Sequence, residues 1–125
     1  MKYFSTNNHN IKVRFKDAVI HGLAPDKGLY FPESILKLPQ SFFDSIESLS
    51  NKEIAFEVIS QFVGNEIPDN ELRQIIAETL SFDFPLVKVE ENVYSLELFH
   101  GPTMAFKDVG ARFMSRCLAY FNKGK

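Results

Sequence analysis

A single apolar stripe along the last part of the chain predicts a long helix. Counting from Lys107, positions i+4, i+7, i+11 and i+14 are all apolar, as on one face of a helix. These positions are Ala111, Met114, Leu118 and Phe121. We therefore expect a helix from near Lys107 to about Asn122, with Gly124 as its capping glycine. Lys107 falls on the stripe itself, so we expect its amine to point where a helix buries surface rather than toward water.

Four earlier segments also have the apolar spacing of helices. The clearest begins at Ser50, where Ser50 and Glu53 form a capping box, and it ends at Gly64. The four apolar faces are Phe15, Ala18 and Val19; Phe42, Ile46 and Leu49; Ala55, Val58, Ile59, Phe62 and Val63; and Leu72, Ile75, Ile76 and Leu80. The last three faces carry no titratable side chain, so we interpret those helices as scaffold.

Short strand-like stretches complete the pattern. We expect an edge strand at Tyr3–Phe4, a brief strand around Val13 and a buried extended piece at Leu29–Phe31. Apolar runs on either side of Glu90–Asn92 predict a hairpin, whose second strand leads into a Gly-Pro turn and the last helix. The order of elements predicts an α+β fold of short strands and several amphipathic helices, ending in a strand-loop-helix unit like the start of a βαβ crossover.

The composition permits a packed core and argues against several functional classes. Hydrophobic residues make up 45% of the 125 residues, with 13 Phe and no Trp, which is enough apolar material for a large core or an interface. The net charge of −2, without a basic block, argues against nucleic-acid binding. We see no membrane span or signal peptide and therefore expect a cytoplasmic protein. No set of His, Cys and acidic residues has metal-ligand spacing, so we expect no metal site.

Lys107 is the candidate for chemistry. Burial favours the neutral form of an amine, and the positive end of a helix acts in the same direction. A neutral amine is what a lysine needs to form a Schiff base with a carbonyl compound. Position alone leaves a solvated surface lysine as the commoner alternative. We expect Cys117 to be a buried small hydrophobe rather than a nucleophile, and Arg112 and Arg116 to form a solvated face.

Residues 96–109, Leu-Glu-Leu-Phe-His-Gly-Pro-Thr-Met-Ala-Phe-Lys-Asp-Val, resemble the cofactor-lysine segment of the threonine synthase family. Tyr3–Thr6 and Gly22–Pro32 resemble the N-terminal domain of that family, so the resemblance covers essentially the whole chain. Related fold-type-II enzymes, which also use pyridoxal phosphate, have a different sequence before their lysine. The resemblance implies an N-terminal domain over residues 1–92. It also implies, over 93–125, the first strand-loop-helix of an α/β pyridoxal-phosphate catalytic domain.

The resemblance also implies a reaction and a set of site residues. Threonine synthases convert O-phospho-L-homoserine and water to L-threonine and phosphate, in a β,γ-replacement that depends on pyridoxal 5'-phosphate. Lys107 would bind this cofactor and move protons, and Phe106 would pack beside the cofactor ring or in the core. His100 and Thr103 could contact the substrate. The alternatives are a structural histidine, and a threonine that caps the last helix at the backbone N–H of Ala105 or Phe106.

Two other functions stay open from the sequence. One is another fold-type-II lyase, such as a phospholyase related to threonine synthase. The other is a small interaction domain without catalysis. The family's phosphate-binding loop would follow the last residue, so we expect an N-terminal fragment that is inactive alone and binds the cofactor weakly at best. We also expect that the exposed face of the last helix, with Lys107, Met114 and Leu118, supports self-association.

Overall fold

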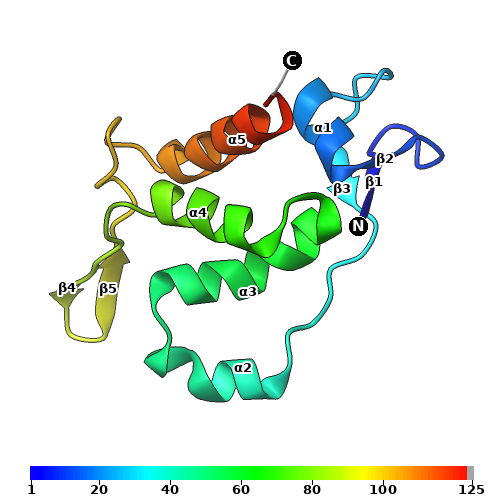
Figure 1. The fold of residues 1–125 in the computed structure, drawn as a ribbon. Coiled ribbons are helices and arrows are strands. Elements are labelled where there is room, and N and C mark those ends of the chain that lie inside the picture. The colour runs from blue at the N-terminus through cyan, green and yellow to red at the C-terminus, as the bar shows by residue number, and fades with distance from the viewer. Residues whose placement is uncertain (124–125) are drawn as a thin grey trace.

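The computed structural model describes residues 1–123, which form a small sheet, a group of helices and a separate hairpin (Figure 1). The sheet contains β1 (Lys2–Ser5), β2 (Lys12–Arg14) and β3 (Tyr30–Pro32). All pairs are antiparallel and the order is β2-β1-β3, so β1 lies in the centre. The predicted edge position of this strand is therefore wrong. β3 arrives from a distant part of the sequence, and a local pattern cannot show such a neighbour.

Helix α1 (Phe15–His21) follows β2 directly and ends, as predicted, at Gly22. The φ angle of Gly22 is 72°, a value that favours glycine because it has no Cβ. The start of α1 has no cap from its own N-cap residue. Instead, the carboxylate of Glu66 accepts hydrogen bonds from the backbone N–H groups of Phe15 (2.9 Å) and Lys16 (3.1 Å). A distant acidic side chain thus satisfies the positive end of this helix.

Three longer helices pack in succession, with α4 between the other two (Figure 1). They are α3 (Asn51–Val63), α4 (Asp69–Thr79) and α5 (Lys107–Phe121), with the short turn η2 (Gly64–Glu66) between α3 and α4. Helix α2 (Gln40–Ser45) and the turn η1 (Ile46–Ser48) precede α3. The predicted capping box is confirmed, because Ser50 Oγ accepts from Glu53 N (3.3 Å) and Glu53 Oε2 accepts from Ser50 N (2.7 Å).

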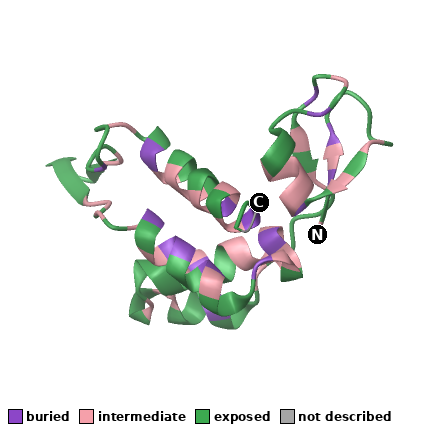
Figure 2. Ribbon diagram, turned by 45° about the horizontal axis from the view of Figure 1, so that its top comes forward, coloured by how far each residue is buried: buried purple, intermediate pink, exposed green. Residues whose placement is uncertain are grey.

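The core joins the sheet to the helices. The rings of Tyr3 and Phe15 have centroids 6.0 Å apart, and those of Phe15 and Phe121 are 6.1 Å apart. The Tyr3 hydroxyl donates to the carbonyl of Phe62 at 2.7 Å, and burial, helped by the charge of Glu66, raises the pKa of Tyr3 to about 12. Other core members are Phe56, Val63, Ile67, Leu72, Ile75, Ile76 and Cys117. Figure 2 shows buried positions along α4 and on α5.

The predicted apolar face of α4 is confirmed, whereas that of α3 is correct only in part. Leu72, Ile75 and Ile76 are buried, as expected for α4. On α3, Val63 is buried but Val58 is exposed, and Phe56 is buried although it lies off the predicted stripe. The guanidinium of Arg73, on α4, lies 3.6 Å from the centroid of the Phe56 ring. A cation–π contact from the neighbouring helix therefore covers this ring.

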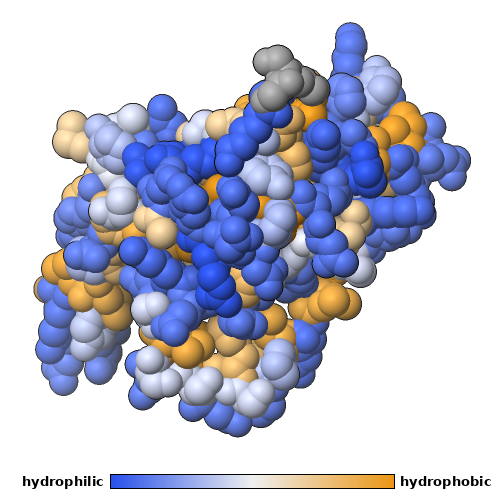
Figure 3. All heavy atoms as spheres, in the orientation of Figure 1, coloured by the Kyte–Doolittle hydropathy of each residue, from blue (hydrophilic) through white to orange (hydrophobic). Residues whose placement is uncertain are grey.

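The predicted hairpin is confirmed as β4 (Leu86–Glu90) and β5 (Val93–Leu96), with Asn92 at a φ of 61° in the turn. Every residue of both strands is exposed, and Figure 3 shows hydrophobic side chains gathered at this part of the surface, at the lower left. Leu29 and Phe31 are also exposed, so the predicted burial of the stretch Leu29–Phe31 is wrong at both of its ends. We expected a domain boundary after residue 92, which lies in the turn of this hairpin. The paired strands β4 and β5 therefore lie on opposite sides of the expected boundary.

The buried face of helix α5 shares only Phe121 with the predicted apolar stripe. Asp108, Cys117 and Phe121 are buried, whereas Lys107 and Met114 are exposed. The expected burial of the lysine is therefore wrong within residues 1–123. The reason is that α4 and α1 both contact α5 along the neighbouring face, which also supports the helix well. The capping glycine that we predicted, Gly124, lies outside the described residues.

Candidate functional site

Residues 97–106 form the loop that leads from β5 to α5 and places Lys107 at the start of the helix. Lys107 is exposed, and within the described residues its ammonium has no hydrogen-bond or ion-pair partner. Nearby in the chain, the side chains of Phe106 and Met104 are 74% and 78% exposed. The accessible amine of Lys107 is therefore adjacent in sequence to exposed apolar side chains.

Asp108, the next residue, turns into the protein and is 4% exposed. Its Oδ1 accepts a hydrogen bond from Thr103 Oγ1 at 2.6 Å, and its Oδ2 accepts one from the backbone N–H of Thr103 at 2.9 Å. The bond from the Thr103 hydroxyl is the main cause that lowers the pKa of Asp108, with help from backbone N–H groups and the charge of Lys107. The carboxylate therefore holds the loop at two points in its ionised form.

Gly101 is buried against this carboxylate and leaves no room for a side chain. A Cβ there would lie 2.5 Å from Asp108 Oδ2, 2.8 Å from Asp108 Cβ and 2.9 Å from Phe82 Cζ. The carbonyl of Gly101 accepts a hydrogen bond from the N–H of Met104 at 2.9 Å. Met104 has a φ of 51°, an uncommon value for a residue with a Cβ, and such strain costs of order 1 kcal/mol. The loop thus adopts a conformation that its surroundings must enforce.

The helix cap predicted at Thr103 is wrong. The N-cap position is Phe106, which has helical backbone angles and no side-chain cap hydrogen bond. The Thr103 hydroxyl bonds to Asp108 instead. This contact between Thr103 and Asp108 was not predicted from the sequence. The signal in the chain is a threonine five residues before an acid in the first turn, a spacing that matches no common capping pattern.

His100 has both a polar and an aromatic partner. Its Nε2 lies 2.7 Å from Glu97 Oε2, and its ring stacks on Phe99 with centroids 4.7 Å apart. These contacts agree with the structural alternative for this residue. Its contact with a substrate stays a prediction, as does the one expected for Thr103.

The solvated face predicted for Arg112 and Arg116 is wrong. Arg112 donates to the carbonyls of Glu78 (2.5 Å) and Thr79 (3.3 Å) and to Ser81 Oγ (2.9 Å). Arg116 forms an ion pair with the carboxylate of Glu78, with Nε 2.9 Å from Oε2. The carbonyls that Arg112 binds lie at the end of α4 and would otherwise lack partners. Together, the two guanidinium groups attach α5 to α4. They orient the helix that begins with the candidate lysine.

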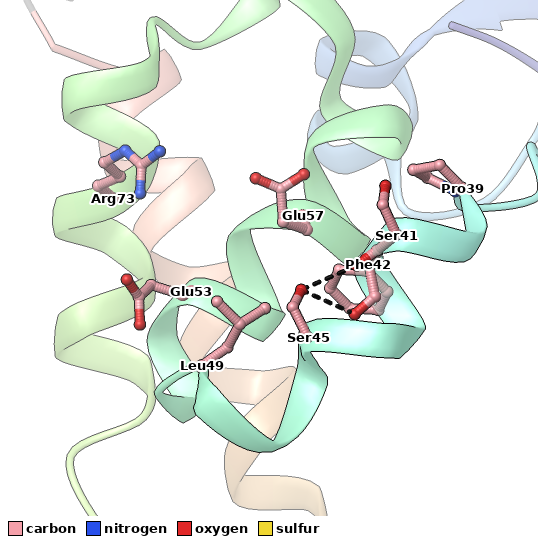
Figure 4. A pocket seen from close by; sticks show the side chains of 8 residues that line it. All are labelled: Pro39, Ser41, Phe42, Ser45, Leu49, Glu53, Glu57 and Arg73. Atoms are coloured by element: carbon pink, nitrogen blue, oxygen red, sulfur yellow. Dashed lines mark hydrogen bonds between the residues drawn. The ribbon is translucent and has the colours of Figure 1, made fainter.

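The hollows on other parts of the surface include two that lie between helices. The one in Figure 4 is lined by α2, α3 and α4, and some of its polar groups have partners within the protein. The Ser45 hydroxyl donates to backbone carbonyls one turn back (2.9 and 3.3 Å), Glu53 belongs to the capping box, and Arg73 covers an aromatic ring. The other hollow, between α3, α4 and α5, has a purely apolar surface. Residues 1–123 contain no cluster of three or more potential metal ligands, and none of their helices is suited to crossing a membrane.

Comparisons with known proteins place the chain in a family. Residues 2–80 match the family model described as threonine synthase N terminus. The chain belongs to the threonine synthase family. It is 38% identical over 120 residues to threonine synthase from Escherichia coli (strain K12), an alignment that covers 96% of this chain. It is 42% identical over 118 residues, 90% of this chain, to the threonine synthase of Haemophilus influenzae.

Solved structures of the threonine synthase family have the same fold over this region. The crystal structure of threonine synthase from Escherichia coli aligns with a TM-score of 0.92 at 37% identity, over 97% of this chain. The structure of threonine synthase from Brucella melitensis with bound PLP aligns with a TM-score of 0.90 at 36% identity, also over 97%. The chain spans about 28% of the length of these relatives, 28% of the first and 27% of the second. The expected mixed α/β architecture and the family resemblance are therefore confirmed.

Proposed function

We propose that the chain contributes the cofactor lysine to a threonine synthase, which converts O-phospho-L-homoserine and water to L-threonine and phosphate with pyridoxal 5'-phosphate. The observation that carries the proposal is the accessible amine of Lys107 at the start of α5, directly after a loop that Asp108 holds in place. Family membership and the PLP-bound relative support it. The accessible amine fits a carbonyl cofactor, although the burial that we expected to favour its neutral form is absent within residues 1–123.

The cofactor, when bound, supplies an electron sink for carbanion chemistry. We assign the remaining tasks to this chain's own residues. Lys107 Nζ holds the cofactor and, when released, accepts and returns protons at the carbon atoms next to it. The exposed ring of Phe106 gives the cofactor an apolar neighbour and excludes water from one side. His100 and Thr103 are proposed as substrate contacts, and both would first have to exchange their present partners, Glu97 and Asp108.

The arrangement of domains forms a further part of the proposal. We assign residues 1–92 to the family's N-terminal domain and 93–125 to the first strand-loop-helix of the catalytic domain. The order β5, loop and α5 supports the second assignment. We propose a cytoplasmic location. We further propose that the exposed face of α5, with Lys107, Met114 and partly exposed Leu118, supports self-association of the chain alone. A compact monomer at all concentrations in sedimentation would contradict the last point.

A chimera tests the proposed function directly. This chain replaces the matching N-terminal region of the Escherichia coli threonine synthase, with which it aligns over 97% of its length. We expect release of phosphate from O-phospho-L-homoserine and growth of a threonine auxotroph. Lys107→Ala should lower the rate by about a thousandfold or more, since it removes both attachment and proton transfer. Lys52→Ala, at an exposed lysine in the first turn of α3, is the matched control and should have no effect.

The outcomes of this test separate the possible functions. A folded chimera that eliminates phosphate without forming threonine would mean that this N-terminal region does not support the addition of water. Equal activity of the Lys107→Ala and unmodified chimeras would contradict the proposed role of the lysine. For the 125-residue chain alone we expect no threonine formation and only substoichiometric borohydride-trapped cofactor, because Lys107 lies open to solvent with few walls around it. A stoichiometric adduct would contradict that expectation.

A further inference from the structure

Asp108 differs from an ordinary acidic residue in the first turn of a helix. Such residues normally lie in solvent and interact with the helix dipole. Asp108 is 4% exposed, and both of its oxygens accept hydrogen bonds from one residue, Thr103, which lies outside the helix. These hydrogen bonds join the first turn of the helix to the preceding loop. The carboxylate therefore acts on the loop rather than on the helix end.

The position of Lys107 depends on this attachment. Consecutive helical residues point about 100° apart, so a buried Asp108 places Lys107 on the open side. The loop also contacts Asp108, because Gly101 packs against its carboxylate. The carbonyl of Gly101 in turn accepts a hydrogen bond from the N–H of Met104. The backbone between Gly101 and Lys107 is thus held at Thr103 by the acid and at Met104 by the turn.

We propose that Asp108 is a positioning residue that fixes the direction of the Lys107 side chain by locking the preceding loop through Thr103. This inference rests on the proposed role of Lys107 in cofactor binding. An apolar side chain at position 108 could fill the space beside Gly101 and Phe82. It would leave the N–H and hydroxyl of Thr103 without acceptors, and the strained φ of Met104 would then be free to relax.

The cofactor-free chain of 125 residues provides the first test. Amide hydrogen exchange at Thr103 and Met104 reports the lock, and the signal of ¹³C-dimethylated Lys107 reports the direction and mobility of the side chain. In Asp108→Ala we expect exchange at Thr103 to rise at least about tenfold, because its acceptor is gone. The Lys107 signal should shift or sharpen in the same variant. Asp83→Ala, at an exposed acid before the hairpin, is the matched control and should change neither readout.

Two threonine variants separate positioning from the charge of the carboxylate. Thr103→Val keeps the charge of Asp108 and the shape of residue 103 but removes the hydroxyl that bonds to Oδ1. We expect it to move the Lys107 signal in the same direction as Asp108→Ala. Thr103→Ser keeps the hydroxyl and should restore both readouts. A Lys107 signal that responds to Asp108→Ala but not to Thr103→Val would overturn the proposal, since charge alone would then explain the effect.

The tests also distinguish folding from positioning. Faster exchange at the core amides of Ile75 and Ile76 would show that Asp108→Ala unfolds the protein. In that case the response of the Lys107 signal to Thr103→Val decides whether the loop positions the lysine. Loss of protection at Thr103 with an unchanged Lys107 signal means a purely structural role and contradicts the inference. None of these measurements needs cofactor or substrate, so they stand even if the chimera is inactive.

Discussion

Two clusters in this molecule have the same chemical parts and different surroundings. The sheet cluster consists of Ser5, Asp26 and Gly28. Ser5 Oγ donates to Asp26 Oδ1 at 2.7 Å, the N–H of Gly28 donates to the same oxygen at 3.0 Å, and a Cβ at Gly28 would lie 2.0 Å from Ser5 Oγ. These hydrogen bonds, that from Ser5 foremost, lower the pKa of Asp26. The cluster joins the end of β1 to the turn before β3.

The loop cluster consists of Gly101, Thr103 and Asp108. Here too a hydroxyl donates to a carboxylate, the pKa of the acid is lowered, and a glycine lies against the pair. The difference lies in what surrounds each cluster. Ser5 of the sheet cluster lies in β1, which pairs with a strand on each side, while Asp26 and Gly28 lie in the turn before β3. Residues 97–106 belong to no strand or helix. In the loop cluster the hydrogen bonds themselves maintain the conformation, and the exposed Lys107 follows directly in the chain.

The role of a hydroxyl, a carboxylate and a glycine in contact therefore depends on the elements that surround them. In the sheet cluster this arrangement stabilises a scaffold that the strand ladder already defines. In the loop cluster it sets the conformation of a segment next to an accessible amine. Stability should therefore respond more to changes in the sheet cluster, and the Lys107 readouts more to changes in the loop cluster.

Substitution of the two glycines should have the largest effect. In Gly28→Ala the new Cβ overlaps Ser5 Oγ and lies 2.9 Å from the backbone N of Asn7, so we expect a loss of about 3 kcal/mol in the free energy of unfolding. Gly101→Ala should cost about half as much, because the loop can shift. Gly110→Ala, where a Cβ meets nothing within 4 Å, is the control and should stabilise α5 by about 0.5–1 kcal/mol. Urea titrations measure all three, and a larger loss for Gly101→Ala would reverse the comparison.

Alkaline pH should destabilise both elements that carry the clusters. Burial raises the pKa of Cys117, on α5, from 9.0 to about 12, and that of Tyr3, on β1, from 10.0 to about 12. Above pH 9 the unfolded thiol loses its proton while the folded thiol keeps it, so stability falls by about 1.4 kcal/mol per pH unit. Between pH 8 and 10.5 this amounts to about 2 kcal/mol from Cys117 and less from Tyr3, which contributes only above pH 10.

The variants Cys117→Ala and Tyr3→Phe separate the two contributions. The first should remove the decline that begins at pH 9, and the second only the part above pH 10. Urea unfolding at a series of pH values provides the measurement. If Cys117→Ala keeps the slope of the unmodified chain, the thiol is not the group responsible.

Removal of the hydroxyls should have a moderate and unequal effect. Ser5 is completely buried, so Ser5→Ala leaves an acceptor with one partner fewer, and we expect a loss of about 1 kcal/mol. Thr103 is exposed, and Thr103→Val should change stability by less than about 0.5 kcal/mol while it alters exchange in the loop. Thermal unfolding and amide exchange, measured on both variants, provide the comparison. Equal losses of stability would mean that the loop is as much a part of the scaffold as the sheet.

The two histidines whose rings contact a phenylalanine should matter least. The ring of His9 lies 4.3 Å from that of Phe4, and the ring of His100 lies 4.7 Å from that of Phe99. Both histidines are exposed, so His9→Gln and His100→Gln should each change the unfolding free energy by less than about 0.5 kcal/mol. A selective loss of substrate affinity in a His100→Gln chimera, with stability unchanged, would support the predicted substrate contact.

Local patterns predicted much of the fold. The capping box at Ser50, the glycine that ends α1, the inner face of α4 and the hairpin turn each depend on a few neighbouring residues, and all were correct. The central position of β1 could not be predicted, because β3 is distant in sequence. The same limit applies to Phe56, whose burial depends on Arg73 of another helix.

The sequence by itself determined that the chain belongs with threonine synthases and that Lys107 begins a helix after a Gly-Pro turn. Only the tertiary structure decided which face of that helix is buried. Periodicity placed Lys107 on an apolar stripe, but the contacts with α4 and α1 select the neighbouring face, with Asp108 and Cys117. The physical reason is that a helix with apolar residues on more than one side can pack in more than one orientation. Here Arg112 and Arg116 join α5 to the end of α4, which leaves the lysine open and its acidic neighbour buried.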